Sequence, residues 1–251
     1  MKITVLGTGT SHGIPVLGCD CEVCTSTDPR NKRTRCSVWI ESETTSLIID
    51  TPPDFRVQGL REGLHNVHGI FYTHAHADHL HGLDDIRPFC WTKSIPVYGN
   101  SPTLEEIRER FSYIFRETQR GGGKPRIELL PLESPVTLGD ITVIPVPIKH
   151  GKMDIYGFRI GSFAYLTDCS GIPEESYSLL RDLDVLILGA LRYREHETHF
   201  SVGQALAEVE KIRPRRAYFT HLCHRLDHAA LDGETPEHVS PAWDGLTLFL
   251  S

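Results

Sequence analysis

Several features that would place this chain in common functional classes are missing from its sequence. No apolar run approaches the roughly 18 residues of a membrane-spanning helix. The first residues lack the longer apolar core and the cleavage site of a signal peptide. Positive charge is not in excess, because 26 Lys and Arg oppose 33 Asp and Glu and leave a net charge of −7. We therefore expect neither nucleic acid nor a membrane as a partner.

Signs of disulfide bonding and of domain division are missing as well. The seven cysteines are an odd number, and without an export signal they predict a reducing, cytoplasmic location. No repeat, low-complexity tract or interdomain linker interrupts the 251 residues. A chain of this length buries roughly 70–75% of its unfolded surface without disulfides. We predict a single domain over residues 1–251.

Short apolar, β-branched runs recur along the chain and predict strands, with helices between them. Hairpin signals at Ser42–Thr45 and Gly161-Ser162 argue against a purely parallel sheet. Helices are predicted from Asp54 to Leu64, after Ser101, over Pro173–Leu183 and over Ala205–Ile212. This alternation is typical of a sheet-rich α/β sandwich. The predicted strands are Lys2–Leu6, Ser37–Glu41, Ser46–Asp50, Gly69–Thr73, Ile95–Tyr98, Ile141–Ile148, Gly157–Ile160, Phe163–Thr167, Val185–Gly189, Ala217–Thr220 and Leu246–Leu250.

Histidine is abundant, with 14 residues, and neutral imidazole is the commonest metal ligand in proteins. The densest cluster, His-Ala-His-Ala-Asp-His at 74–79, directly follows a predicted buried strand. On an extended or turning backbone, His74 and His76 can point to one side while Asp78 and His79 turn toward a neighbour. This spacing predicts ligands for two adjacent metal ions.

Three further ligand-type residues each come just after a predicted strand. They are His150, Asp168 and His221. Each one taken alone favours a turn residue, but loops at one edge of a sheet converge to form sites. Together with the cluster they complete two ligand sets. One ion would be held by His74, His76 and His150, the other by Asp78, His79 and His221, with Asp168 bridging both.

Two adjacent cations would lower the pKa of a bridging water toward 7 and so allow metal-hydroxide attack at neutral pH. The leaving group then needs an acid, and His199, just before a predicted helix, is the candidate. The alternative is that His199 is a surface residue at the helix entry. We count Asp78 with His199 as catalytic. The ligand types fit Mn or Zn, with Fe as a further option.

Three cysteines, Cys19, Cys21 and Cys24, fall within six residues of one loop. In a reducing compartment this spacing predicts three ligands of a structural zinc. His224 is an attractive fourth ligand, and Cys223, Cys36 and His12 are alternatives. The zinc-binding loop would be an insertion at about 18–36. Free thiols or a redox pair are the competing interpretation.

The pattern HxHxDH, a distant His, an Asp within Thr167-Asp168 and a late His after a strand resembles the metallo-β-lactamase superfamily. This resemblance implies an α/β fold, an αββα sandwich of two mixed sheets with two metals at one edge. The sixth position of the motif is His79 here and not Arg. In this respect the motif resembles that of the dinuclear hydrolase branches.

A Gly-Thr-Gly-Thr-Ser-His-Gly-Ile-Pro start, the cysteine loop and Thr-His-x-x-His narrow the resemblance to the PhnP phosphodiesterases. The resemblance implies a structural zinc on Cys19, Cys21, Cys24 and His224, and a catalytic role for His199. It implies opening of 5-phosphoribosyl 1,2-cyclic phosphate, hence phosphonate metabolism. Two segments, Arg192–Glu197 and Leu226–Val239, match no family motif and leave the exact substrate open.

Alternative functions stay open beside a small-molecule phosphodiesterase. A tRNase Z-like nuclease shares the motif, but Arg116–Pro125 is too short for its tRNA-binding arm and the net charge disfavours a polyanion. PqqB-like proteins of cofactor biosynthesis also carry a Cys-rich loop. The expected partner is a small phosphorylated substrate, and a homodimer is compatible with the sequence.

Overall fold

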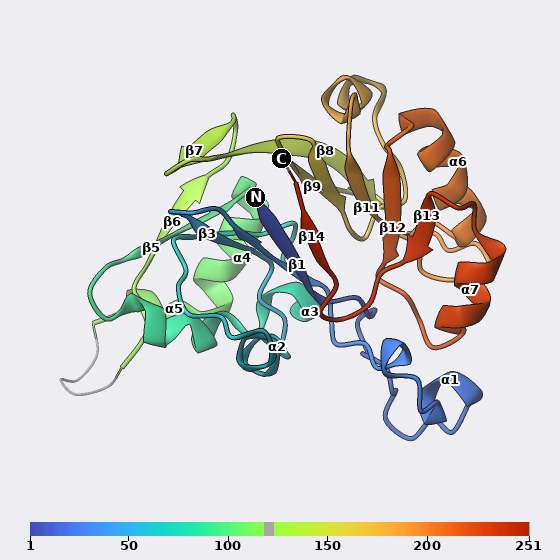
Figure 1. The fold of residues 1–251 in the computed structure, drawn as a ribbon. Coiled ribbons are helices and arrows are strands. Elements are labelled where there is room, and N and C mark those ends of the chain that lie inside the picture. The colour runs from blue at the N-terminus through green and yellow to red at the C-terminus, as the bar shows by residue number, and fades with distance from the viewer. Residues whose placement is uncertain (118–122, 251) are drawn as a thin grey trace.

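The computed structural model describes residues 1–117 and 123–250, and within them two seven-stranded sheets face each other. Helices cover the outer face of each sheet, so the layers run helix, sheet, sheet, helix (Figure 1). The predicted α/β sandwich is therefore confirmed. Residues 118–122 of the segment Arg116–Pro125 lie outside the described residues.

The first sheet has the strand order β14-β1-β2-β3-β4-β5-β6. It is mixed, because β14-β1-β2-β3 are antiparallel neighbours while β3-β4-β5-β6 are parallel. Its strands are β1 (Lys2–Gly7), β2 (Ser37–Glu41), β3 (Ser46–Ile49), β4 (Gly69–Phe71), β5 (Ile95–Gly99), β6 (Ile127–Pro131) and β14 (Thr247–Phe249).

The second sheet has the order β13-β12-β11-β10-β9-β8-β7. It is antiparallel from β7 to β10 and parallel from β10 to β13. Its strands are β7 (Val136–Leu138), β8 (Ile141–His150), β9 (Met153–Ile160), β10 (Phe163–Leu166), β11 (Val185–Gly189), β12 (Arg216–Thr220) and β13 (Val239–Pro241).

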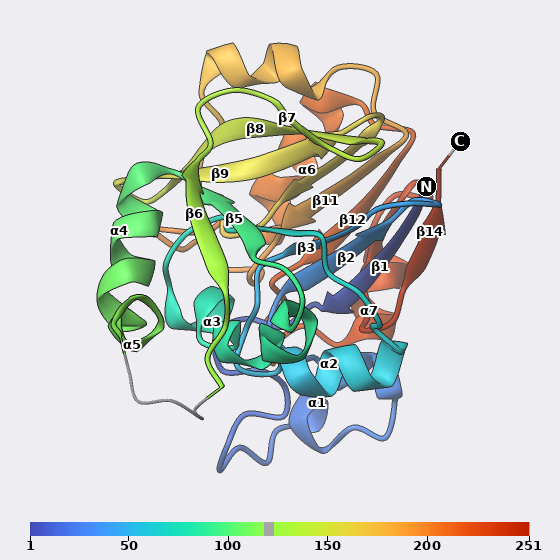
Figure 2. The same cartoon turned by 90° about the vertical axis from the view of Figure 1, so that its left-hand side faces the viewer.

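Helices lie on both outer faces and on the loops (Figure 2). The helices pack on the first sheet through buried apolar side chains such as Ile70, Val97 and Ile107. Another buried apolar cluster, which includes Leu186 and Leu188, joins the helices to the second sheet. The helices are α1 (Glu22–Thr25), α2 (Phe55–Glu62), α3 (Ala77–Leu80), α4 (Ser101–Arg110), α5 (Ser112–Phe115), α6 (Val202–Ile212) and α7 (His228–Glu234), with 3-10 turns at Pro29–Asn31, Leu83–Cys90 and Glu174–Leu180.

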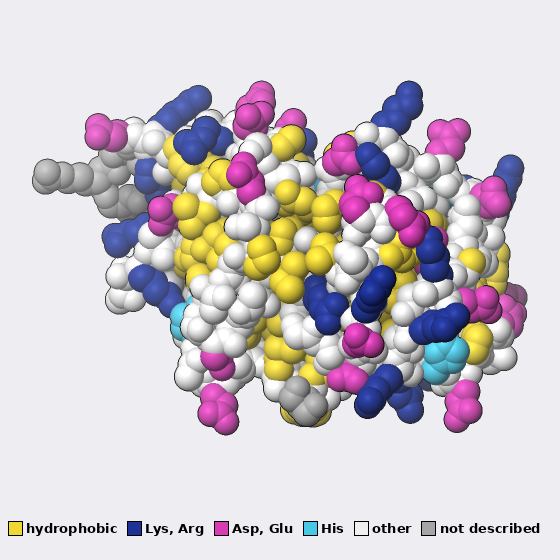
Figure 3. All heavy atoms as spheres, turned by 90° about the horizontal axis from the view of Figure 1, so that it is seen from above, with side chains coloured by type: hydrophobic (Ala, Val, Ile, Leu, Met, Phe, Trp, Pro, Cys, Tyr) yellow, Lys and Arg dark blue, Asp and Glu magenta, His cyan; other side chains and the backbone are white. Residues whose placement is uncertain are grey.

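A separate apolar core fills the space between the two sheets. Ile3, Ile40 and Phe71 reach into it from the first sheet, and Phe158 and Tyr165 reach into it from the second. Both termini lie at one end of this sandwich, where β1 pairs with β14 (Figure 1). Apolar side chains gather over part of that end (Figure 3). Within the described residues, no helix is long and apolar enough to cross a membrane.

Some local predictions were wrong. Pro173–Leu183 was expected to be an α-helix, but only Glu174–Leu180 is helical and it is a 3-10 turn. The run Gly69–Thr73 ends as a strand at Phe71, because Thr73 turns to bond Asp50. Strands β6, β7 and β13 and helix α7 were not predicted, since short edge elements carry little hydrophobic periodicity.

Candidate metal centre

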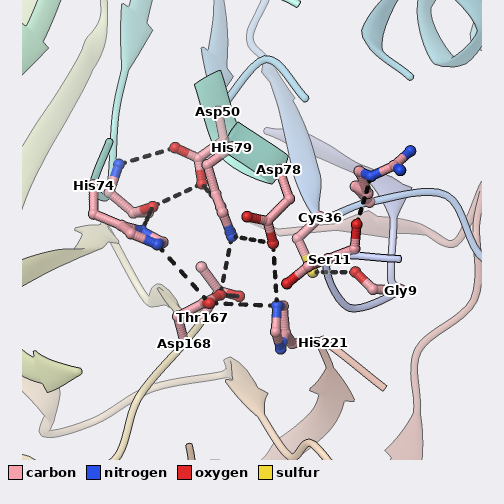
Figure 4. A network of polar contacts seen from close by, with 12 residues as sticks. Gly9, Ser11, Cys36, Asp50, His74, Asp78, His79, Thr167, Asp168 and His221 are labelled. Atoms are coloured by element: carbon pink, nitrogen blue, oxygen red, sulfur yellow. Dashed lines mark hydrogen bonds and ion pairs between the residues drawn. The ribbon is translucent and has the colours of Figure 1, made fainter. Parts of the chain in front are cut away.

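Loops that follow strands of both sheets bring the predicted ligands together at one edge of the sandwich. The cluster at 74–79 follows β4, and α3 begins inside it at Ala77. His150 ends β8, while Asp168 and His221 come just after β10 and β12. Figure 4 shows the side chains of His74, Asp78, His79, Asp168 and His221 pointing toward one another. Parallel neighbours β10, β11 and β12 explain why the last two residues meet at one edge.

The first group of ligand-type atoms belongs to His74, His76 and His150, which lie within 4.8 Å of one another. The ring centroids are 4.5 Å apart for His74 and His76, and 5.0 Å apart for His76 and His150. His74 and His150 are buried, whereas His76 is exposed. The structure thus brings together the three residues predicted for one ion.

The second group consists of four buried residues whose ligand-type atoms also lie within 4.8 Å of one another. Nε2 of His79 lies 3.4 Å from Oδ2 of Asp78 and 3.1 Å from Oδ1 of Asp168. Nε2 of His221 lies 3.6 Å from the Asp78 Oδ2 and 3.3 Å from Oδ2 of Asp168. This group contains the residues predicted for the other ion and the predicted bridging carboxylate.

Asp168 lies between the two groups. Its Oδ2 is 3.9 Å from Nε2 of His74 in the first group and 3.3 Å from Nε2 of His221 in the second. The backbone of Asp168 has φ 54° and that of His221 has φ 57°. Non-glycine residues seldom adopt the left-handed region, and such strain clusters at functional sites. The strained turns aim both side chains at the other ligand-type residues of the cluster (Figure 4).

The electrostatics of the centre follow from burial and close opposite charges. Burial lowers the pKa of His74 well below its ordinary value. Burial also opposes the charged forms of His79 and Asp168, but nearby opposite charges have the stronger effect. The carboxylates of Asp168, Asp78 and Asp50 hold the pKa of His79 well above its usual range. His221 and His79 hold the pKa of Asp168 well below its usual range. The second group is therefore a strongly coupled cluster of opposite charges.

Unpartnered polar atoms test whether cations fit this centre. Within residues 1–117 and 123–250, Nε2 of His74, His79 and His221 is buried and has no hydrogen-bond partner. A buried polar atom without a partner costs roughly 1–3 kcal/mol, so a native fold rarely leaves three in one place. Imidazole nitrogens and carboxylate oxygens that converge in this way are the donor set of a dinuclear metal site. The residues present fit two divalent cations.

Polar contacts of the Nδ1 atom fix the orientation of several of these histidine rings. His79 Nδ1 lies 2.8 Å from Oδ2 of Asp50, and His74 Nδ1 lies 3.0 Å from Oγ1 of Thr73. His150 Nδ1 lies 2.7 Å from the carbonyl oxygen of Thr198. Partners on the second ring nitrogen orient a histidine and raise its basicity as a ligand.

Asp50 is a functional residue that the sequence reasoning missed. It is fully buried, has φ 61°, and accepts hydrogen bonds from the backbone and the hydroxyl of Thr73. Burial raises its pKa, although His79 opposes the shift. The signal was available, because Asp50 follows the buried strand β3 just as Asp168 follows β10.

His199, predicted as the catalytic acid, lies at this centre. Its Nδ1 is 3.8 Å from Oδ2 of Asp168, and its ring centroid is 4.7 Å from those of His150 and His221. Burial, with a further contribution from His221, lowers the pKa of His199 to about 3. His199 also groups with His150 and Asp168 within ligand distance, so a metal-ligand role competes with proton transfer.

The four residues predicted to hold a structural zinc come together where the cysteine loop meets the segment after β12. Sγ of Cys19, Cys21 and Cys24 lies 3.3, 3.6 and 3.7 Å from Nδ1 of His224. Zinc with Zn–S of about 2.3 Å and Zn–N of about 2.0–2.1 Å at tetrahedral angles requires S to N separations of roughly 3.6 Å. These four side chains fit a tetrahedral zinc.

The alternative fourth ligands lie elsewhere. Cys36 is buried against the carbonyl oxygen of Gly9 and the hydroxyl of Thr220, and burial raises its pKa to about 12. Cys223 is buried and its sulfur accepts the amide of Arg225. Neither of them, nor His12, belongs to the four-residue group.

The segment Arg192–Glu197, which the sequence left unassigned, forms a loop beside the centre. The Arg192 guanidinium donates to the carbonyl oxygens of Arg194 and Glu195 and holds the loop closed. The ring of His196 lies 5.2 Å from that of His199. The other unassigned segment, Leu226–Val239, contains α7.

Comparison with known proteins places these features in a family. The model of the Beta-lactamase superfamily domain matches residues 45–222, which is more than half of the chain. A solved diphosphatase of the PhnP family is 41% identical, with 100% of this chain and 98% of that chain covered and a TM-score of 0.93.

Two curated relatives cover nearly the whole chain. An octanoyltransferase of Porphyromonas gingivalis is 38% identical over 254 residues, 98% of this chain but 51% of that protein, so the chain spans about half of the relative's length. Coenzyme PQQ synthesis protein B of Methylorubrum populi is 31% identical over 268 residues, with 94% of this chain and 83% of that protein covered.

The family match extends over the cluster at 74–79, His150, Asp168 and His221, and the whole fold superimposes on the PhnP-family diphosphatase. The resemblance that the sequence indicated is thus confirmed. This chain belongs to the metallo-β-lactamase superfamily, and its fold is that of the PhnP family.

Proposed function

We propose that the chain is a dinuclear-metal phosphoric diester hydrolase that opens a small cyclic phosphodiester similar to 5-phosphoribosyl 1,2-cyclic phosphate. One observation carries this proposal. Two groups of metal-ligand atoms meet at Asp168, with the ring of His199 beside both of them. The similarity to a PhnP-family diphosphatase supports phosphate chemistry at this centre.

Two divalent cations, when bound, supply hydroxide near neutral pH and offset charge that develops on phosphoryl oxygens. We propose Mn or Zn, with Fe as the third option. The chain's residues would hold the two ions close together, since Oδ2 of Asp168 lies 3.9 Å from Nε2 of His74 in the first group and 3.3 Å from Nε2 of His221 in the second. Asp78 lies next to His79 and His221, where its carboxylate can accept a proton beside the reacting phosphate.

His199 is the residue we assign to the leaving-group oxygen. Its ring lies between those of His150 and His221 at the exposed side of the centre, where 13% of its side chain is accessible. Ring opening breaks one of the two ester P–O bonds of a cyclic diester, and the departing alkoxide needs one proton. The neutral imidazole of His199 would take up the proton that the attacking hydroxyl group releases and pass it to that alkoxide, so the ring is neutral before and after the step.

The proposal is tested by purification with metal analysis, followed by assays of bis(p-nitrophenyl) phosphate and of a five-membered cyclic phosphate. We expect three metal ions per chain and turnover of both compounds. Turnover of bis(p-nitrophenyl) phosphate alone would support a diesterase with a different substrate. No turnover of either compound would refute the proposed activity.

Diphosphate hydrolysis is the second candidate, and the 41% identical diphosphatase favours it. A P–O–P linkage presents the same anionic oxygens to the two ions and leaves as phosphate, which needs less help from an acid. The two candidates therefore differ in their dependence on His199. Release of phosphate from a diphosphate, faster than opening of the cyclic diester, would favour this second candidate.

A tRNase Z-like nuclease and a PqqB-like role in cofactor biosynthesis are the remaining alternatives. The net charge of −7 disfavours RNA, whereas the curated PQQ synthesis relative keeps the latter role open. We further propose a cytoplasmic location, where reduced thiols can bind zinc, and a role in phosphonate metabolism. A single domain over 1–251, a small phosphorylated substrate and a homodimer complete the proposal.

A further inference from the structure

The corner between α4 and α5 contacts the metal-binding loop at three successive points. Arg110, the last residue of α4, donates from Nη1 to the carbonyl oxygen of Ala75 over 2.6 Å. The ring of Phe111 meets the ring of His81 edge-on at 6.1 Å. The hydroxyl of Tyr113 bonds Asp84. Ala75, His81 and Asp84 lie in or just after the cluster that supplies four ligands.

Arg110 is itself held in place by its own helix. Its Nε and Nη2 lie 2.9 Å and 2.8 Å from one carboxylate oxygen of Glu106, one turn earlier. A planar guanidinium that is fixed on one edge presents its remaining donor in a defined direction. The surface pair contributes little stability by itself, but it aims Nη1 at the loop.

His76 is the ligand that depends most on this contact. His74, His79 and His150 each have a partner on Nδ1, namely Thr73, Asp50 and the Thr198 carbonyl. Among the described residues, the His76 side chain has no hydrogen-bond partner, and it is exposed. Its direction therefore depends on the backbone that carries it, and the preceding carbonyl group is the one Arg110 holds.

We propose that Arg110 is a positioning residue for the ion held by His74, His76 and His150. It acts through the carbonyl oxygen of Ala75 and touches neither the ion nor the substrate. Partners one step removed from a metal typically change its affinity about 10–100-fold. We expect Arg110→Ala to lower the affinity for this ion about 10-fold and to leave the other catalytic ion and the structural zinc in place.

The test is titration of metal-free protein with Zn²⁺ or Co²⁺, read by metal analysis at limiting metal and by the Co²⁺ visible spectrum. Arg110→Ala should retain two ions where wild type retains three. Arg110→Lys, which keeps a donor but not the fork to Glu106, should restore part of the affinity. Arg108→Ala is the matched control, because Arg108 lies on the same helix over the ring of Phe115.

Glu106→Gln keeps the Arg110 donor but weakens its anchor, and should give an intermediate affinity even where Arg110→Ala folds poorly. Three ions of unchanged affinity in folded Arg110→Ala would overturn the positioning role. Wild type that binds only the cysteine-held ion would overturn it together with the dinuclear centre. Metal binding without diesterase activity would refute the proposed function and leave this role intact.

Discussion

Nε2 of His79 lies 3.1 Å from Oδ1 of Asp168, while Nδ1 of the same ring lies 2.8 Å from Oδ2 of Asp50. One buried imidazole thus lies between two buried carboxylates that follow strands of different sheets. Asp168, Asp78 and Asp50 outweigh the effect of burial and favour a positive charge on the ring, so the pKa of His79 lies well above its ordinary value. A cation at Nε2 would supply that positive charge in place of a proton, with the Nδ1 proton still donated to Asp50, which is why the centre fits metal ions.

Asp168→Asn removes the carboxylate that lies between the two ligand groups. We expect metal binding at the centre to weaken at least 10-fold and phosphodiester turnover to fall by about 10²-fold or more, because a neutral amide neither offsets cation charge nor bridges well. Metal analysis and kinetics measure the effect. Asp184→Asn, at a surface ion pair with Arg215, should leave both unchanged. Full metal content in Asp168→Asn would contradict the bridging role.

His199→Ala should slow cleavage of the cyclic diester by about 10²–10⁴-fold and leave the metal content unchanged. The loss should be smaller for bis(p-nitrophenyl) phosphate, since p-nitrophenolate leaves without a proton. Rates with both substrates check the role of the acid. Equal losses with both would argue against proton donation, and loss of a metal ion would instead assign His199 as a ligand.

Cys21→Ala should reduce the zinc content by one ion and lower stability more than chemistry. A zinc held by these residues would tie the loop at 19–24 to His224, three residues after the strained His221. Buried Arg33 reinforces the same contact by donating to the carbonyl oxygens of Cys223 and Leu226. Metal analysis and thermal unfolding provide the readouts, with Cys90→Ala, a buried thiol outside the cluster, as control. An unchanged zinc count would refute the site.

His228 makes the free energy of unfolding depend on pH, with a sign opposite to that of a salt-bridged histidine. Burial, with the charges of Arg30 and Arg33, lowers its pKa to about 4. Above pH 6.5 the ring is largely neutral in both the folded and the unfolded chain, so it does not change the free energy of unfolding. As the pH falls from 6.5 to 4, the unfolded chain takes up a proton that the folded chain does not, so stability falls by at most about 3 kcal/mol.

Urea unfolding of wild type and His228→Phe between pH 7.5 and 4.5 measures this difference, since other groups titrate in both proteins. The free energy of unfolding of the variant should fall less on acidification than that of wild type. His238→Phe, at an exposed position, is the control and should follow wild type. Parallel curves for wild type and His228→Phe would contradict the burial argument.

Much of the centre could be predicted from the sequence because metal ligands follow strands at short, fixed spacing. His74, Asp168 and His221 each come shortly after an apolar run, and the fold needs only to bring the strand ends together. Asp50 carried the same signal but no neighbouring ligand-type residue drew attention to it. The contribution of Arg110 was not visible, since its contact with Ala75 depends on how α4 packs rather than on spacing.

Elements with little periodicity were harder to predict. Strands β6, β7 and β13 lie at sheet edges or near them and are short. Their formation depends on pairing with β5, β8 and β12 rather than on their own residue pattern. The same limit applies to Arg192–Glu197, whose closed loop depends on Arg192 donating to its own neighbours.

The central claim is that two metal ions on these ligands open a cyclic phosphodiester. The most direct measurement follows 5-phosphoribosyl 1,2-cyclic phosphate by ³¹P NMR with zinc-loaded protein and with protein treated with a chelator. We predict that the cyclic-diester resonance converts to a monoester resonance only with the loaded protein, and that Asp168→Asn slows the conversion by about 10²-fold or more. A cyclic resonance that persists with fully loaded wild type would contradict the account.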